Sequence, residues 1–243
     1  MKPFLFLGTR AEDPAADGEY VSVLRGMGLA EPELRRVRLE RESLGQVNLD
    51  RWSGIVLGGG PFNVSDPPEA KSPVQRRVEA ELGGLARLVV SADFPFLGAC
   101  YGIGTLGVLD GGQVDRTYGE PIGATPVSLT EAGRTDPLFG VLPERFEAFL
   151  GHKEAVARMP EGAVLLATGD RCPVQGFRLR ENVYATQFHP ELDVEDLCLR
   201  IDVYREYGYF DPDDADELKR AARQATVSEP PRLLRRFAEL YAR

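Results

Sequence analysis

Cys100 lies between glycines at the end of an apolar run, in the stretch FLGACYGIGTLG at residues 96–107. Gly98 and Gly102, two residues before and two after the cysteine, would let a strand turn sharply into a helix and hold the thiol exposed at the sheet edge. The backbone N–H of Tyr101, the next residue, would then face a developing oxyanion. The alternative is a buried cysteine beside glycines that bring a helix close to the sheet, and this stretch alone does not separate the two.

A histidine and a carboxylate two residues apart form a second group with chemical potential. His189 and Glu191 lie in QFHPEL, residues 187–192, directly after an apolar segment. On an extended strand both side chains project from the same face, so Glu191 can hold one ring nitrogen and leave the other for a thiol. His189 would then activate Cys100 and later protonate a leaving amine. The alternative is a solvated turn at His-Pro-Glu.

A glycine-rich loop, LGGGPFN at residues 57–63, follows another apolar strand. Its amide N–H groups can approach a ligand closely and donate to an oxyanion. The loop does not match a phosphate-binding motif, because no Lys-Ser or Lys-Thr pair follows and the GxGxxG spacing is missing. On its own it also fits a flexible turn. All three groups follow apolar strands, where ligand sites in open α/β sheets lie, and their joint occurrence favours a nucleophilic site.

Apolar strands alternate with amphipathic helices in the first hundred residues. We expect strands at residues 3–8, 34–40 and 94–100, a strand entering the glycine loop within 52–66, and helices at 17–29 and 72–93. Beyond residue 110, short segments with turn signals, including VYATQF at 183–188, indicate an added antiparallel edge. The pattern predicts an α/β fold with a mostly parallel central sheet covered by helices on both faces, an antiparallel edge and C-terminal helices.

The last fifty residues have apolar positions at helical spacing and charged faces that would meet solvent or another copy of the chain, which makes a homo-oligomer one expected assembly. Neither an internal repeat nor a long linker interrupts the chain. We therefore predict one domain at residues 1–192 and a C-terminal helical extension at residues 193–243 packed on the same domain.

The composition excludes several classes of partner. Of the 243 residues, 29 are Lys or Arg and 38 are Asp or Glu, for a net charge of -9, and no basic block occurs, so a nucleic-acid partner is not expected. No stretch approaches the roughly 20 apolar residues that span a bilayer, and the N-terminal apolar run is too short for a signal peptide. Three scattered cysteines, Cys100, Cys172 and Cys198, suit a reducing cytoplasm. We predict no metal ligand set and no cofactor.

The motifs GGGP, LGACYG and QFHPE, in this order between residues 53 and 192, resemble those of the class I glutamine amidotransferase family, and most closely the glutaminase domain of GMP synthetases and its stand-alone relatives. The resemblance implies a Cys-His-Glu triad in which Cys100 attacks a γ-glutamyl amide, His189 is the general base and then the acid, and Glu191 orients the histidine. It also implies an oxyanion hole formed by the N–H groups of Gly60 and Tyr101. The substrate-binding residues expected with it are Gly59, Gly104, His152 and Gln187.

The sequence departs from the family pattern at two places. The family commonly reads Cys-x-Gly-x-Gln, with the glutamine helping to hold the substrate, whereas this chain has Gly104 at that position. The GMP synthetase branch has a Ser-His-Gly-Asp stretch, which corresponds here to GHKEAV, so that His152 matches while Lys153 and Glu154 differ. We expect His152 at the rim of the pocket, the alternative being a surface histidine.

The resemblance implies hydrolysis of glutamine to glutamate and ammonia. Because the sequence shows no synthetase domain, the ammonia would pass to an acceptor on a synthetase-type partner chain or be released. A γ-glutamyl peptidase or amidase acting on another γ-glutamyl compound is an alternative, which the open space at Gly104 favours. A non-catalytic regulatory module of the same fold is a third interpretation, disfavoured by the intact triad. An α/β-hydrolase is disfavoured because that fold places its acid before its histidine.

Overall fold

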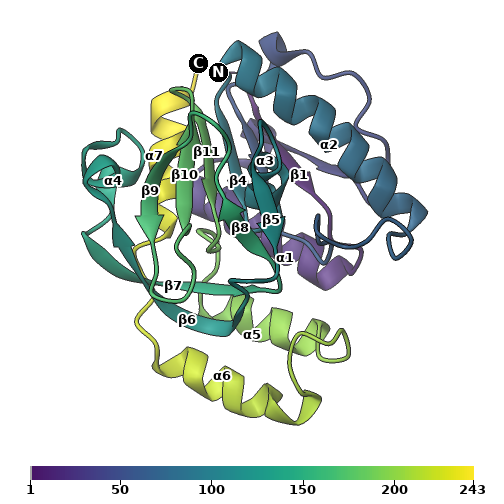
Figure 1. Cartoon of the computed structure of the whole chain (residues 1–243), viewed down its shortest axis with the longest axis vertical. Helices are drawn as coiled ribbons and strands as arrows, with labels where there is room; N and C mark the ends of the chain where they lie inside the picture. Colours follow the sequence, from purple (N-terminus) through teal and green to yellow (C-terminus); the bar gives the residue numbers. More distant parts are fainter. Residues whose placement is uncertain (1) are drawn as a thin grey trace.

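The computed structural model describes residues 2–243, which form a central sheet between two layers of helices (Figure 1). The strands are β1 (Phe4–Gly8), β2 (Leu34–Arg38), β3 (Ile55–Leu57), β4 (Phe96–Ala99), β5 (Gln113–Asp115), β6 (Glu120–Leu129), β7 (Arg145–His152), β8 (Ala155–Arg158), β9 (Val164–Thr168), β10 (Gly176–Leu179) and β11 (Val183–Thr186). The α-helices are α1 (Asp13–Met27), α2 (Pro73–Ala92), α3 (Tyr101–Gly107), α4 (Glu131–Thr135), α5 (Val194–Val203), α6 (Ala215–Gln224) and α7 (Pro231–Tyr241).

The main sheet has nine strands in the order β2-β1-β3-β4-β11-β10-β9-β6-β7. The first five are parallel to their neighbours, and the pairs from β11 onward are antiparallel. The predicted α/β class, with a covered parallel sheet and an antiparallel addition, is confirmed, and the antiparallel part supplies as many strand pairs as the parallel part. The two remaining strands, β5 and β8, pair with each other in a small separate sheet.

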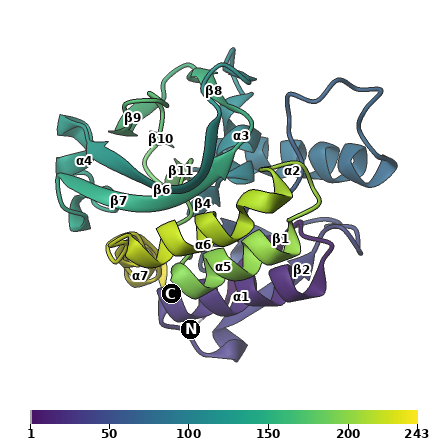
Figure 2. The same cartoon turned by 90° about the horizontal axis from the view of Figure 1, so that it is seen from below.

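Alternation along β1 assigns its side chains to the two faces of the sheet. Phe4 and Phe6 pack in a cluster with α1 and α7, whereas Leu5 and Leu7 pack in a second cluster with α2 and α3. Figure 2 shows α1 and α2 on opposite sides of β1. Both faces of the parallel half are therefore buried, as the continuous apolar strands predict.

Helix boundaries follow local capping signals. Helix α1 ends where Gly28 adopts a left-handed conformation with φ 67°, which glycine reaches without a steric penalty. Helix α2 begins after Ser72, whose hydroxyl accepts the N–H of Gln75. Both helices confirm the expected segments, although α1 starts earlier than residue 17 because Pro14 is favourable in its first turn.

Strand β11 corrects one expectation. VYATQF was expected to join the antiparallel edge, but β11 pairs in parallel with β4 over Val183–Thr186 and lies inside the sheet. Its neighbour on the other side, β10, is the antiparallel partner that ends the parallel half. The segment is fully buried, and its short apolar pattern suits a central strand as well as an edge strand. The sequence QFHPE consequently follows the strand next to Cys100.

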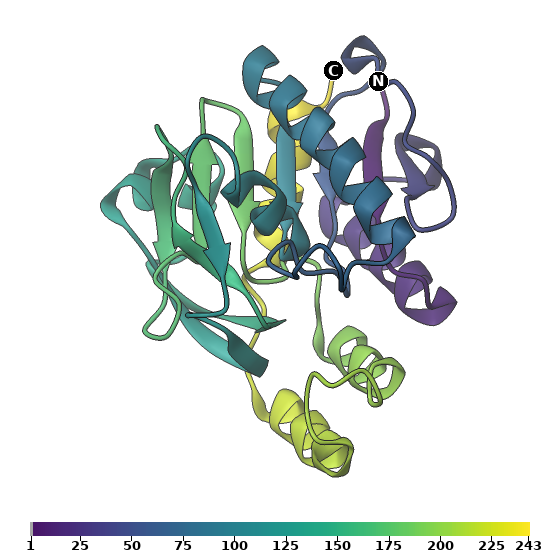
Figure 3. The same cartoon turned by 45° about the vertical axis from the view of Figure 1, so that its right-hand side comes forward.

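The C-terminal residues contact several parts of the sheet and its helices. Helix α7 covers the face that carries Phe4, with the rings of Phe4 and Phe237 6.0 Å apart. Helices α5 and α6 pack around Phe149 of β7 and extend below the strands in Figure 3. Asp193 caps α5 through the N–H of Asp196. The division of the chain at residues 192 and 193 stays a prediction. No helix within residues 2–243 is both long and apolar enough to cross a membrane.

Candidate active site

Cys100 occupies a strained turn between β4 and α3. Its φ of 52° and ψ of −92° are rarely adopted by a residue with a side chain, and such strain concentrates at functional sites. The glycines around it permit the turn, because a Cβ at Gly98 would lie 2.8 Å from the carbonyl carbon of Gly102. The cysteine is partly exposed rather than buried. This geometry favours the interpretation of Cys100 as a nucleophile over that of a core residue.

Strand β11 brings the histidine to this turn. The N–H of Cys100 donates to the carbonyl of Thr186, the last residue of β11, over 2.8 Å. Three residues later, the N–H of His189 donates to Phe149 O of β7 over 3.0 Å, which fixes the backbone of the histidine. The side chains of His189 and Cys100 both lie against Gly59 and line the same cavity. Two groups far apart in the sequence thus form one nucleophile and base pair.

Glu191 completes the arrangement on the far side of the imidazole. His189 Nδ1 lies 2.8 Å from Glu191 Oε1 and 3.1 Å from Arg200 Nη1. A guanidinium only donates, and Arg200 already donates to Glu191 over 2.9 Å. We therefore assign the Nδ1 proton to the bond with Glu191, which leaves Nε2 for Cys100. A carboxylate that fixes the tautomer in this way is the role expected of the third member of a triad.

The electrostatics favour a protonated His189 beside an ionised Glu191. Burial by itself would lower the pKa of His189, but the Glu191 carboxylate and Cys100 outweigh it and raise this pKa to about 9. Burial would raise the pKa of Glu191, and the cations of His189 and Arg200 instead hold it well below its usual range. An imidazolium at His189 is poised to give a proton to a leaving group.

Three buried charges support the triad and were not foreseen from the sequence. Arg10, after β1, pairs with Glu19 of α1 over 3.1 Å, and Arg200 of α5 lies 3.4 Å from the same carboxylate. The sequence signal for a buried Glu19 is its spacing from Val23 and Met27, which places all three on one face of α1. All three side chains are buried. A carboxylate on an apolar face requires a buried partner.

The carboxylates of this charge cluster are neutralised without a metal ion. Glu19, His189 and Glu191 have donor atoms within 4.8 Å of one another. Arg10 and Arg200 nevertheless neutralise the two carboxylates, so a divalent cation would have to displace a guanidinium. The arrangement fits a hydrogen-bonded network rather than a metal centre.

The glycine-rich loop lies against the nucleophile. A Cβ at Gly59 would be 2.5 Å from His189 Cε1 and 3.4 Å from Cys100 Cβ, and one at Gly60 would be 1.9 Å from Thr9 Oγ1. Only glycine leaves room for the imidazole and for the loop to pack so closely. Within residues 2–243 the N–H groups of Gly60 and Tyr101 have no acceptor. Two free amide donors beside a thiol have the character of an oxyanion hole.

Two cavities meet at Cys100. Both contain Gly60, Gly151 and Tyr209 in their walls. The first cavity is further lined by Tyr101, Gly104, His152, Lys153, Glu154 and Gln187. The second cavity is further lined by His189, Ile122, Leu150, Leu192, Leu197 and Tyr204. The predicted substrate-binding residues, except Gly59, thus lie around the first cavity, together with Tyr101.

Two residues in the wall of the first cavity have buried polar atoms without partners. Gln187 Oε1 and Tyr101 Oη have no hydrogen-bond partner within the described residues, although both side chains are buried. Lys153 places its ammonium 4.3 Å from the centre of the Tyr209 ring. A buried polar atom without a partner is costly, so these two oxygens are unusual features of the cavity wall.

Glu154 fills the space beside Gly104. Its two carboxylate oxygens accept the N–H groups of Val64 and Ser65, each over 2.8 Å. A Cβ at Gly104 would lie 3.3 Å from Glu154 Oε1 and 3.3 Å from a methyl carbon of Val64. Burial raises the pKa of Glu154, against the two backbone hydrogen bonds that lower it. Glu154 therefore lies beside the position where the family has a glutamine side chain. Its carboxylate also fixes the loop that follows the glycines.

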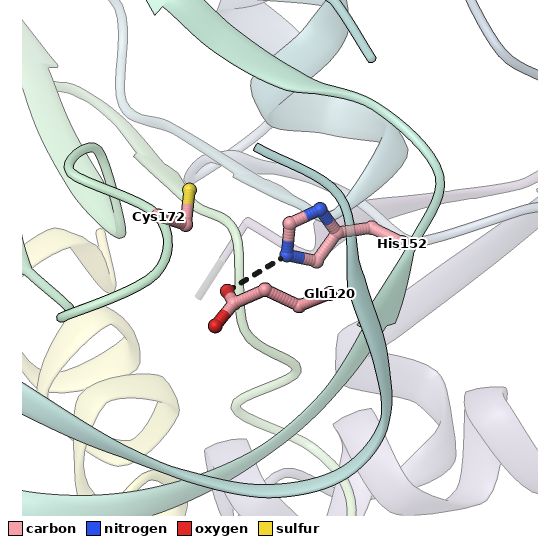
Figure 4. Close-up of side chains that lie close together, drawn as sticks. All are labelled: Glu120, His152 and Cys172. Atoms are coloured by element: carbon pink, nitrogen blue, oxygen red, sulfur yellow. Dashed lines mark hydrogen bonds and ion pairs between the residues drawn. The ribbon is translucent and has the colours of Figure 1, made fainter. Parts of the chain in front are cut away.

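His152 is buried in the wall of the first cavity and is not a surface histidine. Its Nδ1 bonds to Glu154 O over 2.8 Å. Its Nε2 bonds to Glu120 Oε2 over 3.1 Å, as drawn in Figure 4. Gln175 donates to the same carboxylate oxygen over 2.7 Å. Both ring nitrogens are engaged, so His152 supports the Lys153 and Glu154 segment rather than offering a free nitrogen to a ligand.

Cys172 lies close to this pair, and together the three residues form a second potential metal-ligand group. The Cys172 thiol donates to Val174 O, and burial raises its pKa to about 12. The thiol and both ring nitrogens of His152 are thus engaged in hydrogen bonds, which fits a hydrogen-bonded cluster.

Comparison with known proteins identifies the family. The model of the family "Glutamine amidotransferase class-I" matches residues 22–196, which is more than half of the chain. The chain belongs to the class I glutamine amidotransferase family. Cys100, His189 and Glu191 all lie within the matched segment, as the motif resemblance implied.

Curated relatives include glutamine-hydrolyzing GMP synthases. The GMP synthase A chain of Thermoplasma acidophilum is 29% identical over 160 residues, which cover 65% of this chain and 72% of that protein. The corresponding A chain of Methanocaldococcus jannaschii is 31% identical over 140 residues, 57% of this chain and 64% of the relative. The match to GMP synthase of Thermosipho melanesiensis is 29% identical over 141 residues, 58% of this chain and only 24% of that longer protein.

Solved structures share the whole fold. The structure of a glutamine amidotransferase from Thermotoga maritima superposes with a TM-score of 0.77 at 22% identity and covers 99% of this chain and 98% of its own. A glutamine amidotransferase from Methylobacillus flagellatus gives a TM-score of 0.67 at 21% identity, with 100% and 93% covered. The α/β fold of this family therefore includes the C-terminal helices of the chain.

Proposed function

We propose that the chain hydrolyses the γ-amide of glutamine through a cysteinyl γ-glutamyl thioester. The observation that carries this proposal is the strained turn that holds Cys100 in one cavity wall with His189, whose Nδ1 lies 2.8 Å from Glu191. A nucleophile, a base oriented by a carboxylate, and two free amide donors are the parts that acyl transfer requires.

In the first half of the proposed reaction, the sulfur of Cys100 attacks the γ-carbonyl carbon and the carbonyl oxygen gains negative charge. The N–H groups of Gly60 and Tyr101 stabilise that charge. The carbon–nitrogen bond then breaks, and His189 gives its proton to the departing nitrogen so that ammonia leaves. Glu191 stabilises the imidazolium throughout.

In the second half, water attacks the thioester carbon and His189 takes its proton. The carbon–sulfur bond breaks, the sulfur recovers its initial state, and glutamate leaves. Gly59, Gly104, His152 and Gln187 belong to the proposed substrate site, with His152 acting through the backbone it fixes. We propose that the ammonia passes to a synthetase-type partner chain, because curated relatives include separate A chains of GMP synthase.

A γ-glutamyl peptidase or amidase activity is the second candidate. The specific observation in its favour is the replacement of the family glutamine by Gly104, with Glu154 occupying the adjoining space. This arrangement changes the wall that contacts the substrate and leaves the triad unchanged, so the chemistry would be retained with another γ-glutamyl compound.

The test uses an electrophilic γ-glutamyl diazoketone and glutamine with the intact chain. We expect mass spectrometry to find the adduct on Cys100, and ammonia release from glutamine to disappear in Cys100→Ala. Cys172→Ala and Cys198→Ala are matched controls that should keep the adduct. Undiminished turnover in Cys100→Ala would refute the triad assignment. Co-purification with a synthetase-like protein would test the proposed acceptor.

A further inference from the structure

The two cavities at Cys100 correspond to the two halves of a scissile amide. Cys100 and Gly60 border both cavities, whereas Tyr101 lies only in the wall of the first and His189 only in the wall of the second. The oxyanion donors hold the acyl carbonyl, and the general acid must reach the departing nitrogen. The first cavity is therefore on the acyl side of the bond, and the second cavity is on the amine side.

The wall of the amine-side cavity is apolar. Leu150, Leu192 and Leu197 are buried side chains that line it, together with the half-buried Ile122. Four aliphatic side chains around one cavity provide a surface for a hydrocarbon group. Ammonia is small and strongly hydrated, and it has no group that would use such a surface.

The charged groups in the same wall are occupied by each other. Arg10 is paired with Glu19 and its Nη1 donates to the hydroxyl of Tyr204 over 3.1 Å. Arg200 donates to Glu191. These groups are therefore not available to solvate a charged or strongly polar amine substituent, and burying such a substituent would be unfavourable.

Part of this wall comes from residues beyond the family match, which ends at residue 196. Leu197 and Tyr204 belong to α5 and its C-terminal end, and Tyr209 follows in the loop before α6. Tyr209 also borders the acyl-side cavity, where Lys153 lies over its ring. The segment after α5 thus covers the nucleophile and closes both cavities on one side.

We propose that the second cavity binds an apolar substituent on the amide nitrogen, so that γ-glutamyl amides of primary alkylamines are substrates of this site. The proposal rests on the thioester chemistry proposed above for Cys100. The same carbon–nitrogen bond breaks, His189 supplies the proton, an alkylamine leaves in place of ammonia, and water then hydrolyses the thioester to glutamate.

The test compares glutamine with the γ-glutamyl amides of methylamine, propylamine and butylamine. A fourth compound, the γ-glutamyl amide that carries a 3-aminopropyl group on its nitrogen, is a charged counterpart of the butyl amide. We expect kcat/KM to rise by about fourfold per methylene that the cavity buries. The charged amide should fall well below the butyl amide. Calorimetric Kd values for Cys100→Ala should follow the same order, and this readout does not depend on turnover.

A pair of variants tests the location of the subsite. Ile122→Asp introduces a carboxylate at a half-buried wall position and should lower the ratio of kcat/KM for the butyl amide to that for the aminopropyl amide by at least about tenfold. Val21→Asp changes an exposed position of α1, 54% accessible, and should leave this ratio at its wild-type value.

The outcomes separate the two proposals. If the diazoketone does not label Cys100 and no amide is bound or hydrolysed, the thioester chemistry fails and the amine subsite fails with it. If glutamine is hydrolysed through Cys100 while kcat/KM and affinity stay constant or fall with chain length, only the amine subsite is overturned. A wild-type ratio in Ile122→Asp would likewise overturn its assignment to this wall.

Discussion

Gly104 and Glu154 share one space in the wall of the first cavity, with 3.3 Å between the position of a Cβ on the glycine and Glu154 Oε1. The carboxylate in turn holds the N–H groups of Val64 and Ser65. The two positions are consequently coupled, and a change at one should depend on the residue at the other.

Gly104→Gln should destabilise the chain by about 1–3 kcal/mol, because its side chain must displace Glu154 or Val64. Adding Glu154→Gly should recover at least about 1 kcal/mol of that loss by removing the clash. Urea unfolding of the two single variants and the double variant measures the coupling. Gly84→Gln is the matched control, since nothing lies within 4 Å of a Cβ there. Additive effects would contradict the shared space.

The rate of hydrolysis should fall as the pH rises through about 9. The pKa of His189 is raised to that value, so the proton needed by the leaving nitrogen is bound below it and lost above it. Glu191→Gln removes a negative charge and should move this alkaline limb to lower pH. Profiles of kcat against pH for both proteins give the measurement. An unchanged limb in the variant would show that another group controls it.

The same pKa shift predicts a pH dependence of stability. A histidine whose folded pKa is raised contributes stabilisation that is complete below its unfolded pKa, about 6.5, and is lost as the pH rises through the folded pKa of about 9. His189→Gln should therefore cost more stability at pH 6 than at pH 10. Urea titrations of both proteins at the two pH values check the sign, and an equal cost at both would refute it.

Arg200→Met should lower both stability and activity, because it leaves Glu191 buried with one cation fewer. Breaking a buried ion pair costs about 3–5 kcal/mol when one charge remains. Thermal unfolding measures the loss of stability, and the rate of glutamine hydrolysis by the folded variant measures the effect on the triad. Arg223→Met changes an exposed arginine of α6 and provides the control. A similar result for both variants would place the effect outside the triad.

Gly59→Ala should leave the fold intact and lower kcat by about a hundredfold. The added methyl would lie 2.5 Å from His189 Cε1, so the imidazole must move away from Cys100, and a displacement of about 1 Å can cost that much. Gly84→Ala is the control. Wild-type kcat in Gly59→Ala, with circular dichroism showing the native fold, would contradict the packing of this loop against the triad.

Local chemistry explains which parts could be predicted from the sequence. The glycines around Cys100 have direct structural consequences, and the helix caps at Gly28 and Ser72 follow from single residues. His189 and Glu191 do meet, but across a turn that follows β11 and not along an extended strand. The pairing of one strand with another in the sheet has no such local signal in the sequence. The segment at Val183–Thr186 is equally apolar for a parallel or an antiparallel neighbour, and only tertiary contacts decide its place beside β4.

The buried charges show the second limit. Glu19 and Arg200 occupy apolar faces of their helices, which indicates burial but names no partner. Their meeting near Glu191 depends on how α1 and α5 pack, and the sequence spacing carries no information on that packing. Likewise, the departure at Gly104 was visible, whereas its compensation by Glu154 required the loop contacts with Val64 and Ser65.

The position of β11 inside the sheet also bears on how the chain acquires its site during synthesis. The turn at Cys100 can form once β3, β4 and α3 have left the ribosome, but His189 arrives only with the strand that enters beside β4. Contacts of such long sequence separation form late in folding. A nascent chain would thus carry an isolated thiol from the synthesis of Cys100 until that of His189, and hydrolytic competence would appear together with closure of the sheet.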